Sequence, residues 1–269
     1  FIKKGTKVLG SAPTFTSYPS DVELGEGIFD YVPLGENHNF KFDAEKFISC
    51  ITHEYTLVYI DNPNNPTGQI IPLEHIMKIV KKARENNVCV LIDEAYGDFM
   101  DETNSAINLV DSYENIMVSR TFSKGFGLAA LRIGYVIAGN YLSDIISKVD
   151  IPFTINSLAQ HAAVAALKHR EFILKSRRDI SNIKRTLMST VKILKVLETS
   201  LQVPIITITV PDSNIDLHRL FRINGVLTES GEDFYGLGRN FVRMRIPADY
   251  LELINRIGKI EEYLKLRNV

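Results

Sequence analysis

Three short segments carry most of the residues that could do chemistry, and each follows an apolar run of the chain. Residues 61–68 read DNPNNPTG, residues 93–96 read DEAY, and residues 119–132 read SRTFSKGFGLAALR. In open sheets of parallel strands, ligands bind at the carboxyl ends of the strands. If the three apolar runs are neighbouring strands, the three segments meet at one edge of a sheet and form one site.

Each of the first two segments also has a structural explanation when it is considered alone. The proline, asparagine and glycine residues of positions 61–68 favour a tight, rigid turn. An acidic pair such as Asp93 and Glu94 at the end of a strand can cap a helix. Both explanations stay open for the single segment, and the combination of segments weighs against them.

The third segment suits a phosphate group, because two hydroxyls, a lysine and an arginine offer several donors and positive charge. It also matches the GxGxxG/A pattern of dinucleotide-binding proteins at Gly125, Gly127 and Ala130. That pattern must open a helix directly after a strand. The next apolar run begins near Ile133, which leaves no room for such a helix, so the sequence argues against a nicotinamide cofactor.

The elements that must position these segments follow from the hydrophobic pattern. Four runs are continuously apolar rather than alternating, which predicts buried strands at residues 57–60, 88–92, 116–119 and 134–138. Between the first two, apolar residues recur at helical spacing over residues 73–86. This strand-helix-strand unit predicts an α/β fold with a mostly parallel sheet.

The second half of the chain predicts a bridging helix and a smaller module. Residues 157–197 contain neither proline nor glycine and predict one long helix between two domains. Its basic stretch, residues 175–185, is interpreted as a solvated helix face, with a binding patch as the alternative. Beyond it, the pattern predicts strands at 203–210, 226–228 and 241–246 and helices at 216–224 and 250–265. We therefore expect a large domain over residues 1–160 and a small α+β C-terminal domain over residues 161–269.

The composition is that of an ordinary globular protein of 269 residues, 45% of them hydrophobic. Lys plus Arg number 31 and Asp plus Glu number 32, so no bulk charge attracts nucleic acid or anionic lipid. No apolar run approaches the roughly 20 residues that span a bilayer. Cys50 and Cys89 lie far apart, without histidines at ligand spacing, which predicts no metal site and a reducing, cytoplasmic environment. We expect small molecules as partners, and neither nucleic acid nor a membrane.

In combination, the segments resemble those of the fold-type-I aminotransferases, and within them the branch that includes histidinol-phosphate aminotransferase. Four motifs occur in the family's order and at about its separations: NPNNPTG at 62–68, DEAY at 93–96, SRTFSKGFGLAALRIGY at 119–135 and FVRMRIP at 241–247. PTF at residues 13–15 adds a match near the start. The resemblance implies the fold-type-I transferase fold, pyridoxal 5'-phosphate (PLP) as cofactor, and a homodimer with active sites at the subunit interface.

The resemblance implies that Lys124, Asp93 and Tyr96 are the catalytic residues. Lys124 matches the lysine that forms a Schiff base with the cofactor aldehyde and then moves a proton, which requires a primary amine with a lowered pKa. Asp93 matches the residue that keeps the pyridine nitrogen protonated, so that the ring accepts electrons. Asn65 and Tyr96 match residues that hydrogen-bond the phenolic oxygen of the ring, and we expect Asn65 to contact the substrate as well.

Further matches concern the ends of the cofactor and of the substrate. Thr121, Ser123 and Arg132 match the donors to the cofactor phosphate, and a guanidinium suits that anion. Phe15 matches the aromatic residue that stacks on the cofactor ring, with packing in a core as its alternative. Arg243 matches the residue that holds the substrate carboxylate, since a guanidinium fork fits this group better than an ammonium does.

Two features depart from the family. In relatives, roughly ninety further residues precede the first one here and supply a helix N-terminus for the cofactor phosphate, and also a tyrosine that reaches the neighbouring subunit. The sequence starts at Phe1 without a methionine, so we expect it to begin inside a domain. Glu229 stands where histidinol-phosphate aminotransferases carry an arginine for the substrate phosphate, and an acidic group would repel that phosphate. Arg245, which shares a strand face with Arg243, is interpreted as a surface charge rather than a second clamp.

The predicted activity is that of an aminotransferase, which moves an amino group between an amino acid and a 2-oxo acid such as 2-oxoglutarate. Decarboxylases and carbon–sulfur lyases of the same fold share these motifs and are the alternative. An inert, truncated module that keeps the fold without a complete site is a further alternative. The amino donor stays open between histidinol phosphate and aromatic, aliphatic or acidic amino acids.

Overall fold

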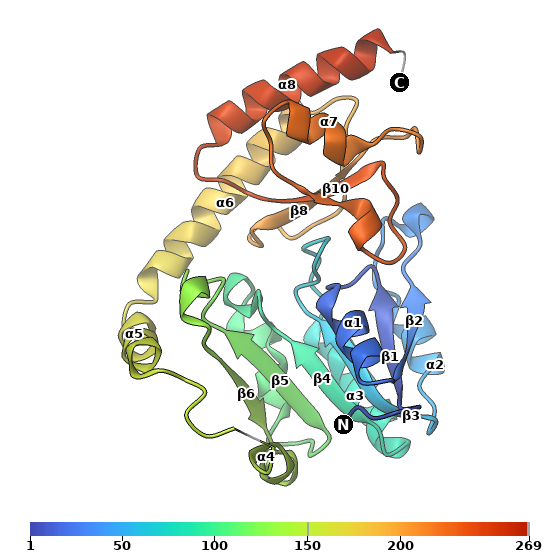
Figure 1. Cartoon of the computed structure of the whole chain (residues 1–269), viewed down its shortest axis with the longest axis vertical. Coiled ribbons are helices and arrows are strands. Elements are labelled where there is room, and N and C mark those ends of the chain that lie inside the picture. The colour runs from blue at the N-terminus through green and yellow to red at the C-terminus, as the bar shows by residue number, and fades with distance from the viewer. Residues whose placement is uncertain (150, 268–269) are drawn as a thin grey trace.

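Two β-sheets form the framework of the protein, and helices pack against both (Figure 1). The computed structural model describes residues 1–149 and 151–267. The strands are β1 (Lys7–Ala12), β2 (Ile28–Pro33), β3 (Tyr55–Asp61), β4 (Cys89–Asp93), β5 (Ile116–Thr121), β6 (Gly134–Ala138), β7 (Lys195–Val196), β8 (Ile205–Thr209), β9 (Glu229–Ser230) and β10 (Phe241–Arg245). The α-helices are α1 (Ser17–Leu24), α2 (Ala44–Ser49), α3 (Leu73–Glu85), α4 (Asn140–Ser147), α5 (Ser157–Leu167), α6 (Glu171–Thr190), α7 (Leu217–Ile223) and α8 (Tyr250–Leu266).

The larger sheet has the strand order β2-β1-β3-β4-β5-β6. Its first five strands run parallel, and β6 lies antiparallel to β5 at one end. The predicted strands in the first half of the chain correspond to β3, β4, β5 and β6, and the predicted helix at residues 73–86 corresponds to α3. The expected α/β class with a mostly parallel sheet is confirmed.

The sequence pattern does not predict β1 and β2, which extend the large sheet on its other side. β1 contains Gly10 and Ser11 where a buried strand usually has branched side chains. Gly10 avoids a collision there, because a Cβ atom at this position would overlap the ring of Phe29 on β2. β2 itself buries only Val32, so it lacks the continuous apolar run of the central strands.

β6 is not the buried strand that its apolar sequence predicts. Gly134, Tyr135 and Val136 are all exposed. β6 is the last strand in the order of the large sheet and pairs with β5 alone among the described strands. An apolar run that fits a central strand equally fits an edge strand, so the run alone does not distinguish the two positions.

Residues 157–197 do not form the single helix that was expected. Residues 168–170 separate α5 from α6, and residues 191–194 lead from α6 into β7. Both helices contact the cluster around the loop between β5 and β6, through Ala159 of α5 and Ile173 of α6, but α6 continues into the core of the small sheet, where Leu187 lies. Tertiary packing thus breaks a segment that has no helix-breaking residue. Figure 1 shows α6 running from the large sheet toward the small one.

The interpretation of the basic stretch 175–185 as a solvated helix face is wrong for one of its lysines. Lys184 is fully buried, and its Nζ donates to Thr199 Oγ1 at 3.0 Å and to the carbonyl oxygens of Ser200 and Ile205 at 2.7 and 2.8 Å. Burial lowers the pKa of Lys184 well below its usual value. These acceptors fix α6 to the small sheet.

The small sheet has the order β7-β8-β10-β9 and is antiparallel. The strand predicted at residues 226–228 is wrong, since the strand forms at Glu229–Ser230 instead. Val226 belongs to the C-terminal turn of α7: its backbone N–H donates to Phe221 O at 3.0 Å after Gly225, which has a φ of 75°. This shift brings Glu229 opposite Arg243 on β10.

Helix α8 closes the outer side of the small sheet. Its buried residues Leu253, Ile257, Ile260 and Leu264 recur at helical spacing and lie in the cluster that contains the strands β8 and β10. Within the described residues, no helix is both long and apolar enough to cross a membrane.

Candidate active site

The three polar segments meet at one edge of the large sheet, as their spacing predicts. In the parallel register, Asp61 at the end of β3 lies beside Asp93 of β4, and Asp93 lies beside Ser119 of β5. The loops that follow these strands therefore leave the sheet side by side. Residues far apart in the sequence can thus share one ligand.

Asp61 organises the first of these loops. Its carboxylate accepts hydrogen bonds from Thr14 Oγ1 at 3.1 Å, from Asn64 Nδ2 at 3.0 Å and from the backbone N–H of Asn65 at 2.8 Å. The side-chain amide of Asn65 makes no hydrogen bond with any described residue, and its Oδ1 is fully buried. A buried amide without a partner is costly unless a ligand supplies one, so Asn65 is available to a bound molecule.

The burial of Asp61 predicts that the stability of the fold depends on pH. Burial raises the pKa of Asp61 from 3.8 to about 7, although the backbone N–H of Asn65 and the side chain of Asn64 oppose the rise. The folded state therefore holds a proton that the unfolded state releases, and stability falls as the pH rises from about 4 to 7. Relative to Asp61→Asn, the wild-type chain should lose about 2 to 3 kcal/mol of stability between pH 5 and pH 8.

Urea unfolding of both chains at a series of pH values measures this difference. The comparison with Asp61→Asn cancels the contributions of the other titrating groups. A pH profile with the same slope for both chains would show that the Asp61 carboxyl does not titrate in this range.

The protein donates two hydrogen bonds to one oxygen of the Asp93 carboxylate. Its Oδ1 accepts from the backbone N–H of Ala95 at 2.9 Å and from Ser119 Oγ at 3.2 Å. Both of these hydrogen bonds reach Oδ1, and the buried hydroxyl of Tyr59 is a further neighbour that acts on the carboxylate. Burial raises the pKa of Asp93, and the hydrogen bonds and the charge of Lys124 act in the opposite direction. The carboxylate can accept a proton or a hydrogen bond from a ligand.

Lys124 lies over the ring of Tyr96, with 5.4 Å between Nζ and the ring centroid. Its ammonium group makes no hydrogen bond or ion pair within the described part of the chain. Burial lowers the pKa of Lys124, and the positive charges of Arg243 and Arg245 lower it further. A lysine in this environment has a larger fraction of neutral amine near pH 7, which is the form that acts as a nucleophile or a base.

Arg243 joins the small sheet to this site. Its Nη1 lies 2.7 Å from Glu229 Oε1, its Nη2 donates to Tyr96 Oη at 2.8 Å, and its Nε is buried without a partner among the described residues. Tyr96 therefore contacts Arg243 and Lys124 at once. Arg245 is exposed, in line with its interpretation as a surface charge.

The expected phosphate donors are only partly assembled. Thr121 Oγ1 donates to Ser123 Oγ at 3.0 Å and accepts from the backbone N–H of Ser123 at 3.1 Å. Arg132 has a left-handed backbone with a φ of 52°, and its exposed guanidinium donates to Ala129 O at 2.9 Å. Phe15 follows β1 at the same sheet edge and is 37% exposed. Thr121 and Ser123 thus lie together, while no described contact joins Arg132 or Phe15 to them.

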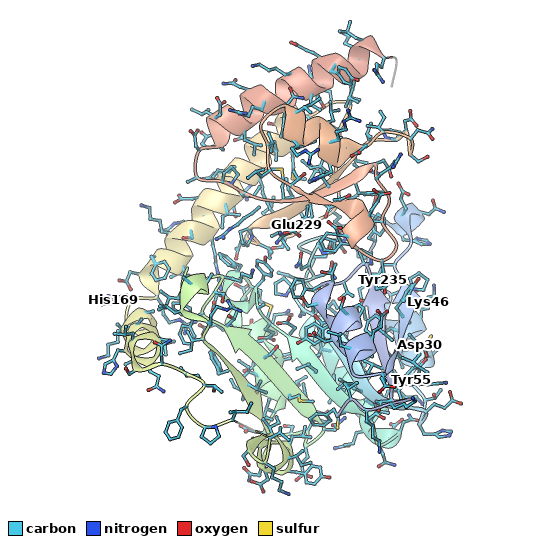
Figure 2. The ribbon with its side chains drawn as sticks, in the orientation of Figure 1. Asp30, Lys46, Tyr55, His169, Glu229 and Tyr235 are labelled. Atoms are coloured by element: carbon cyan, nitrogen blue, oxygen red, sulfur yellow. The ribbon has the colours of Figure 1, made fainter. Side chains whose placement is uncertain are left out.

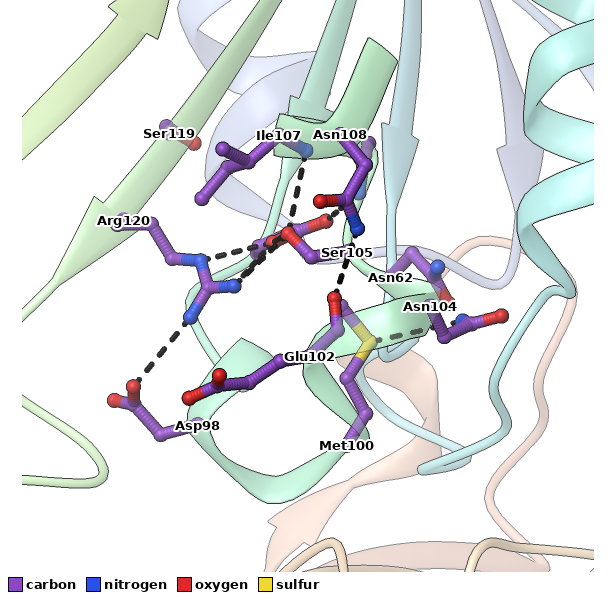
Figure 3. Close-up of polar contacts among 12 residues, drawn as sticks. Asn62, Asp98, Met100, Glu102, Asn104, Ser105, Ile107, Asn108, Ser119 and Arg120 are labelled. Atoms are coloured by element: carbon purple, nitrogen blue, oxygen red, sulfur yellow. Dashed lines mark hydrogen bonds and ion pairs between the residues drawn. The ribbon is translucent and has the colours of Figure 1, made fainter. Parts of the chain in front are cut away.

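One buried ionic network beside the site is not predicted from the sequence. Glu94, 1% exposed, pairs with Arg120 at 2.7 Å and also accepts from Ser105 Oγ at 2.7 Å and from Ala106 N at 2.6 Å. Figure 3 shows Arg120 reaching Asp98 and Ser105 as well.

The alternation of side chains along β5 is the sequence signal that could have separated Arg120 from the residues of the ligand site. On β5, Ser119 and Thr121 share the face of the site, so Arg120 must point to the opposite face. The second acid of the DEAY motif, Glu94, serves this network rather than the ligand site. Within the described residues, no cluster of three or more histidine, cysteine, aspartate or glutamate residues has the geometry of a metal site.

Comparison with known proteins agrees with this arrangement. The sequence profile of the class I and II aminotransferases matches residues 1–230. The chain therefore belongs to the class I and II aminotransferase family. It is 36% identical over 194 residues to the histidinol-phosphate aminotransferase of Ruminiclostridium cellulolyticum, in an alignment that covers 71% of this chain and 53% of that protein. The chain thus spans about half the length of this relative.

Solved structures share the fold. The histidinol-phosphate aminotransferase of Clostridium acetobutylicum superimposes with a TM-score of 0.87 at 23% identity, covering 96% of this chain and 79% of that one. The corresponding enzyme of Sinorhizobium meliloti, solved in complex with pyridoxal-5'-phosphate, gives a TM-score of 0.80 at 22% identity and covers 98% and 72%. The predicted fold type I is confirmed.

Proposed function

We propose that this chain binds PLP and transfers an amino group from an amino acid to a 2-oxo acid such as 2-oxoglutarate. One arrangement supports this proposal most directly: Asn65 and Lys124 in the loops after β3 and β5, and Asp93 at the end of β4, lie at one sheet edge, and the buried Asn65 Oδ1 has no hydrogen-bond partner among the described residues. These groups fit the three polar positions of the PLP ring: the aldehyde, the pyridine nitrogen and the phenolic oxygen. The family assignment supports the same cofactor.

Bound PLP supplies an aldehyde that captures amines and a ring that takes up the electron pair released at the substrate Cα. Each residue of the chain then has one role in the proposal. Lys124 holds the cofactor and carries the proton to and from Cα, for which its lowered pKa is suited. Asp93 keeps a proton at the ring nitrogen through its carboxylate. Asn65 and Tyr96 orient the phenolic oxygen.

The remaining roles concern the phosphate, the ring face and the substrate. Thr121, Ser123 and Arg132 are proposed to hold the cofactor phosphate, which requires Arg132 to turn away from Ala129 O. Phe15 is proposed to cover the ring. Arg243 is proposed to hold the substrate carboxylate, and its buried Nε offers a donor without a partner in the part of the chain that the structure describes.

Domain division, assembly and location complete the proposal. We propose a large domain over residues 1–160 and a small domain over residues 161–269, a division supported by the two sheets at residues 7–138 and 195–245. A homodimer is proposed from the family resemblance, and a cytoplasmic location from the two separate cysteines, Cys50 and Cys89. Arg177 supports close contact between the two domains, since its Nε donates to Asp98 O at 2.8 Å and its guanidinium also reaches Met100 O.

A panel assay tests the proposed reaction. The chain is incubated with PLP, individual amino acids and 2-oxoglutarate, and the products are separated. We expect glutamate to appear together with the 2-oxo acid of the donor, and none to appear without PLP. Release of carbon dioxide or ammonia without glutamate would identify a decarboxylase or a lyase and contradict the proposal.

A further inference from the structure

Glu229 occupies a position beside the proposed substrate clamp that has no role in the reaction described above. It faces Arg243 across the β9–β10 pairing, and its Oε1 lies 2.7 Å from Arg243 Nη1. The Glu229 side chain is 52% exposed, whereas that of Arg243 is 11% exposed. Figure 2 shows Glu229 on the side of the small sheet that faces the large one. The carboxylate therefore lies between Arg243 and open space.

The charges explain what happens when a substrate carboxylate binds Arg243. In the free protein, Glu229 and Arg243 neutralise each other. Once a substrate carboxylate takes the guanidinium, the same arginine faces two carboxylates, and Glu229 is left with an uncompensated charge. A positive group on the substrate would restore the balance. A second negative group on the substrate would add to the uncompensated negative charge and be repelled by Glu229.

We propose that Glu229 is a specificity-determining residue that favours amino acids with a cationic side chain over those with a phosphate or a second carboxylate. This inference rests on the proposed function, because it assigns the substrate class of the same site. Cationic means an ammonium, a guanidinium or an imidazolium group, each of which can donate hydrogen bonds to a carboxylate. Discrimination comes from a repulsive element as well as an attractive one.

The positive charge of Arg245 could oppose the preference for cationic side chains. Arg245 lowers the pKa of Lys124 and borders the same opening as Lys124. Its side chain is exposed, so solvent and salt screen its charge more strongly than that of the partly buried pair. Glu229 should therefore dominate the choice of side chain, and Arg245→Gln should change it little.

Three unreactive ligands of equal length test the inference. 4-Guanidinobutanoate, hexanoate and adipate share one carboxylate and a chain of six non-hydrogen atoms, and they end in a guanidinium, a methyl or a second carboxylate. None has a primary amine, so none can condense with the PLP aldehyde or enter the transfer reaction. Binding to the PLP-incubated chain is followed through the Nε–H NMR signal of Arg243, which is assigned by its loss in Arg243→Lys.

We expect the wild-type chain to bind 4-guanidinobutanoate on the order of tenfold more tightly than hexanoate, and adipate most weakly. In Glu229→Gln the three affinities should converge, and in Glu229→Lys the order should reverse. Glu232→Gln is the matched control, because Glu232 lies three residues away on the next turn and pairs with the exposed Arg239 at 3.8 Å. It should keep the wild-type order.

Three results would overturn the inference: equal ratios in wild type and Glu229→Gln, a wild-type preference for adipate, or no ligand effect on the Arg243 signal. Borohydride reduction of the chain with PLP, followed by mass analysis, is read separately. A missing product on Lys124 would contradict the proposed function and leave the ligand order as evidence on Glu229. A product on Lys124 with equal ligand affinities would contradict the inference alone.

Discussion

Replacing Lys124 with alanine is expected to abolish the covalent capture of PLP and to reduce amino transfer by at least about 10⁴-fold. Lys124 is the lysine whose charge acts on Asp93, and burial together with the charges of Arg243 and Arg245 lowers its pKa, which favours the neutral form. Because the side chain of Lys124 makes no hydrogen bond within the described structure, we expect the unfolding free energy to change by less than about 1 kcal/mol. Borohydride reduction with peptide mass analysis measures the capture, and glutamate formation measures the transfer.

Two controls separate lost chemistry from damaged structure. Lys192→Ala removes an exposed lysine after α6 and should leave both the capture and the transfer unchanged. Adding methylamine to Lys124→Ala should restore part of the proton transfer, because a small amine can occupy the vacated space. If Lys124→Ala still yields a reduced PLP adduct on another lysine together with normal transfer, Lys124 is not the cofactor lysine.

The position of the site was predictable because it depends on local residue types. Turn-forming residues at 61–68, an acidic pair after β4 and a lysine between hydroxyls after β5 each follow a strand, and parallel strands place their ends at one edge. The identity of the ligand was predictable only from the combination of the sequence motifs. A single loop, such as the one with Lys124, also fits an ordinary phosphate site.

Features that depend on contacts between distant segments could not be predicted. The break between α5 and α6 accompanies a change in packing, because α6 extends from the cluster that it shares with α5 into the core of the small sheet, and nothing in residues 168–170 signals it. The ion pair of Glu229 with Arg243 depends on the β9–β10 register, which the cap of α7 displaces from residues 226–228. The burial of Lys184 depends on acceptors in the strand and loop that follow α6.

The ionic network of Arg120 is another set of contacts between distant segments that the sequence does not predict. Removing Arg120 is expected to have a large effect on stability. Arg120→Ala leaves the carboxylate of Glu94 buried without its cation, which should lower the unfolding free energy by about 3 to 5 kcal/mol. That is a large part of the roughly 5 to 15 kcal/mol that stabilises a typical domain. Burial already raises the pKa of Glu94, and Arg120 opposes the rise. Without Arg120 the pKa should rise further, so acidification should restore part of the lost stability by protonating Glu94.

Urea unfolding of four chains tests this prediction: wild type, Arg120→Ala, Glu94→Gln and the double variant. The double variant should be more stable than the sum of the two single losses implies, because the neutral amide no longer needs the guanidinium. Arg170→Ala is the matched control, since Arg170 pairs with Glu102 at 2.8 Å where both side chains are more than half exposed. Such a surface pair contributes at most about 1 kcal/mol. A loss in Arg120→Ala no larger than that in Arg170→Ala would mean that the Glu94 carboxylate does not depend on Arg120 for its burial.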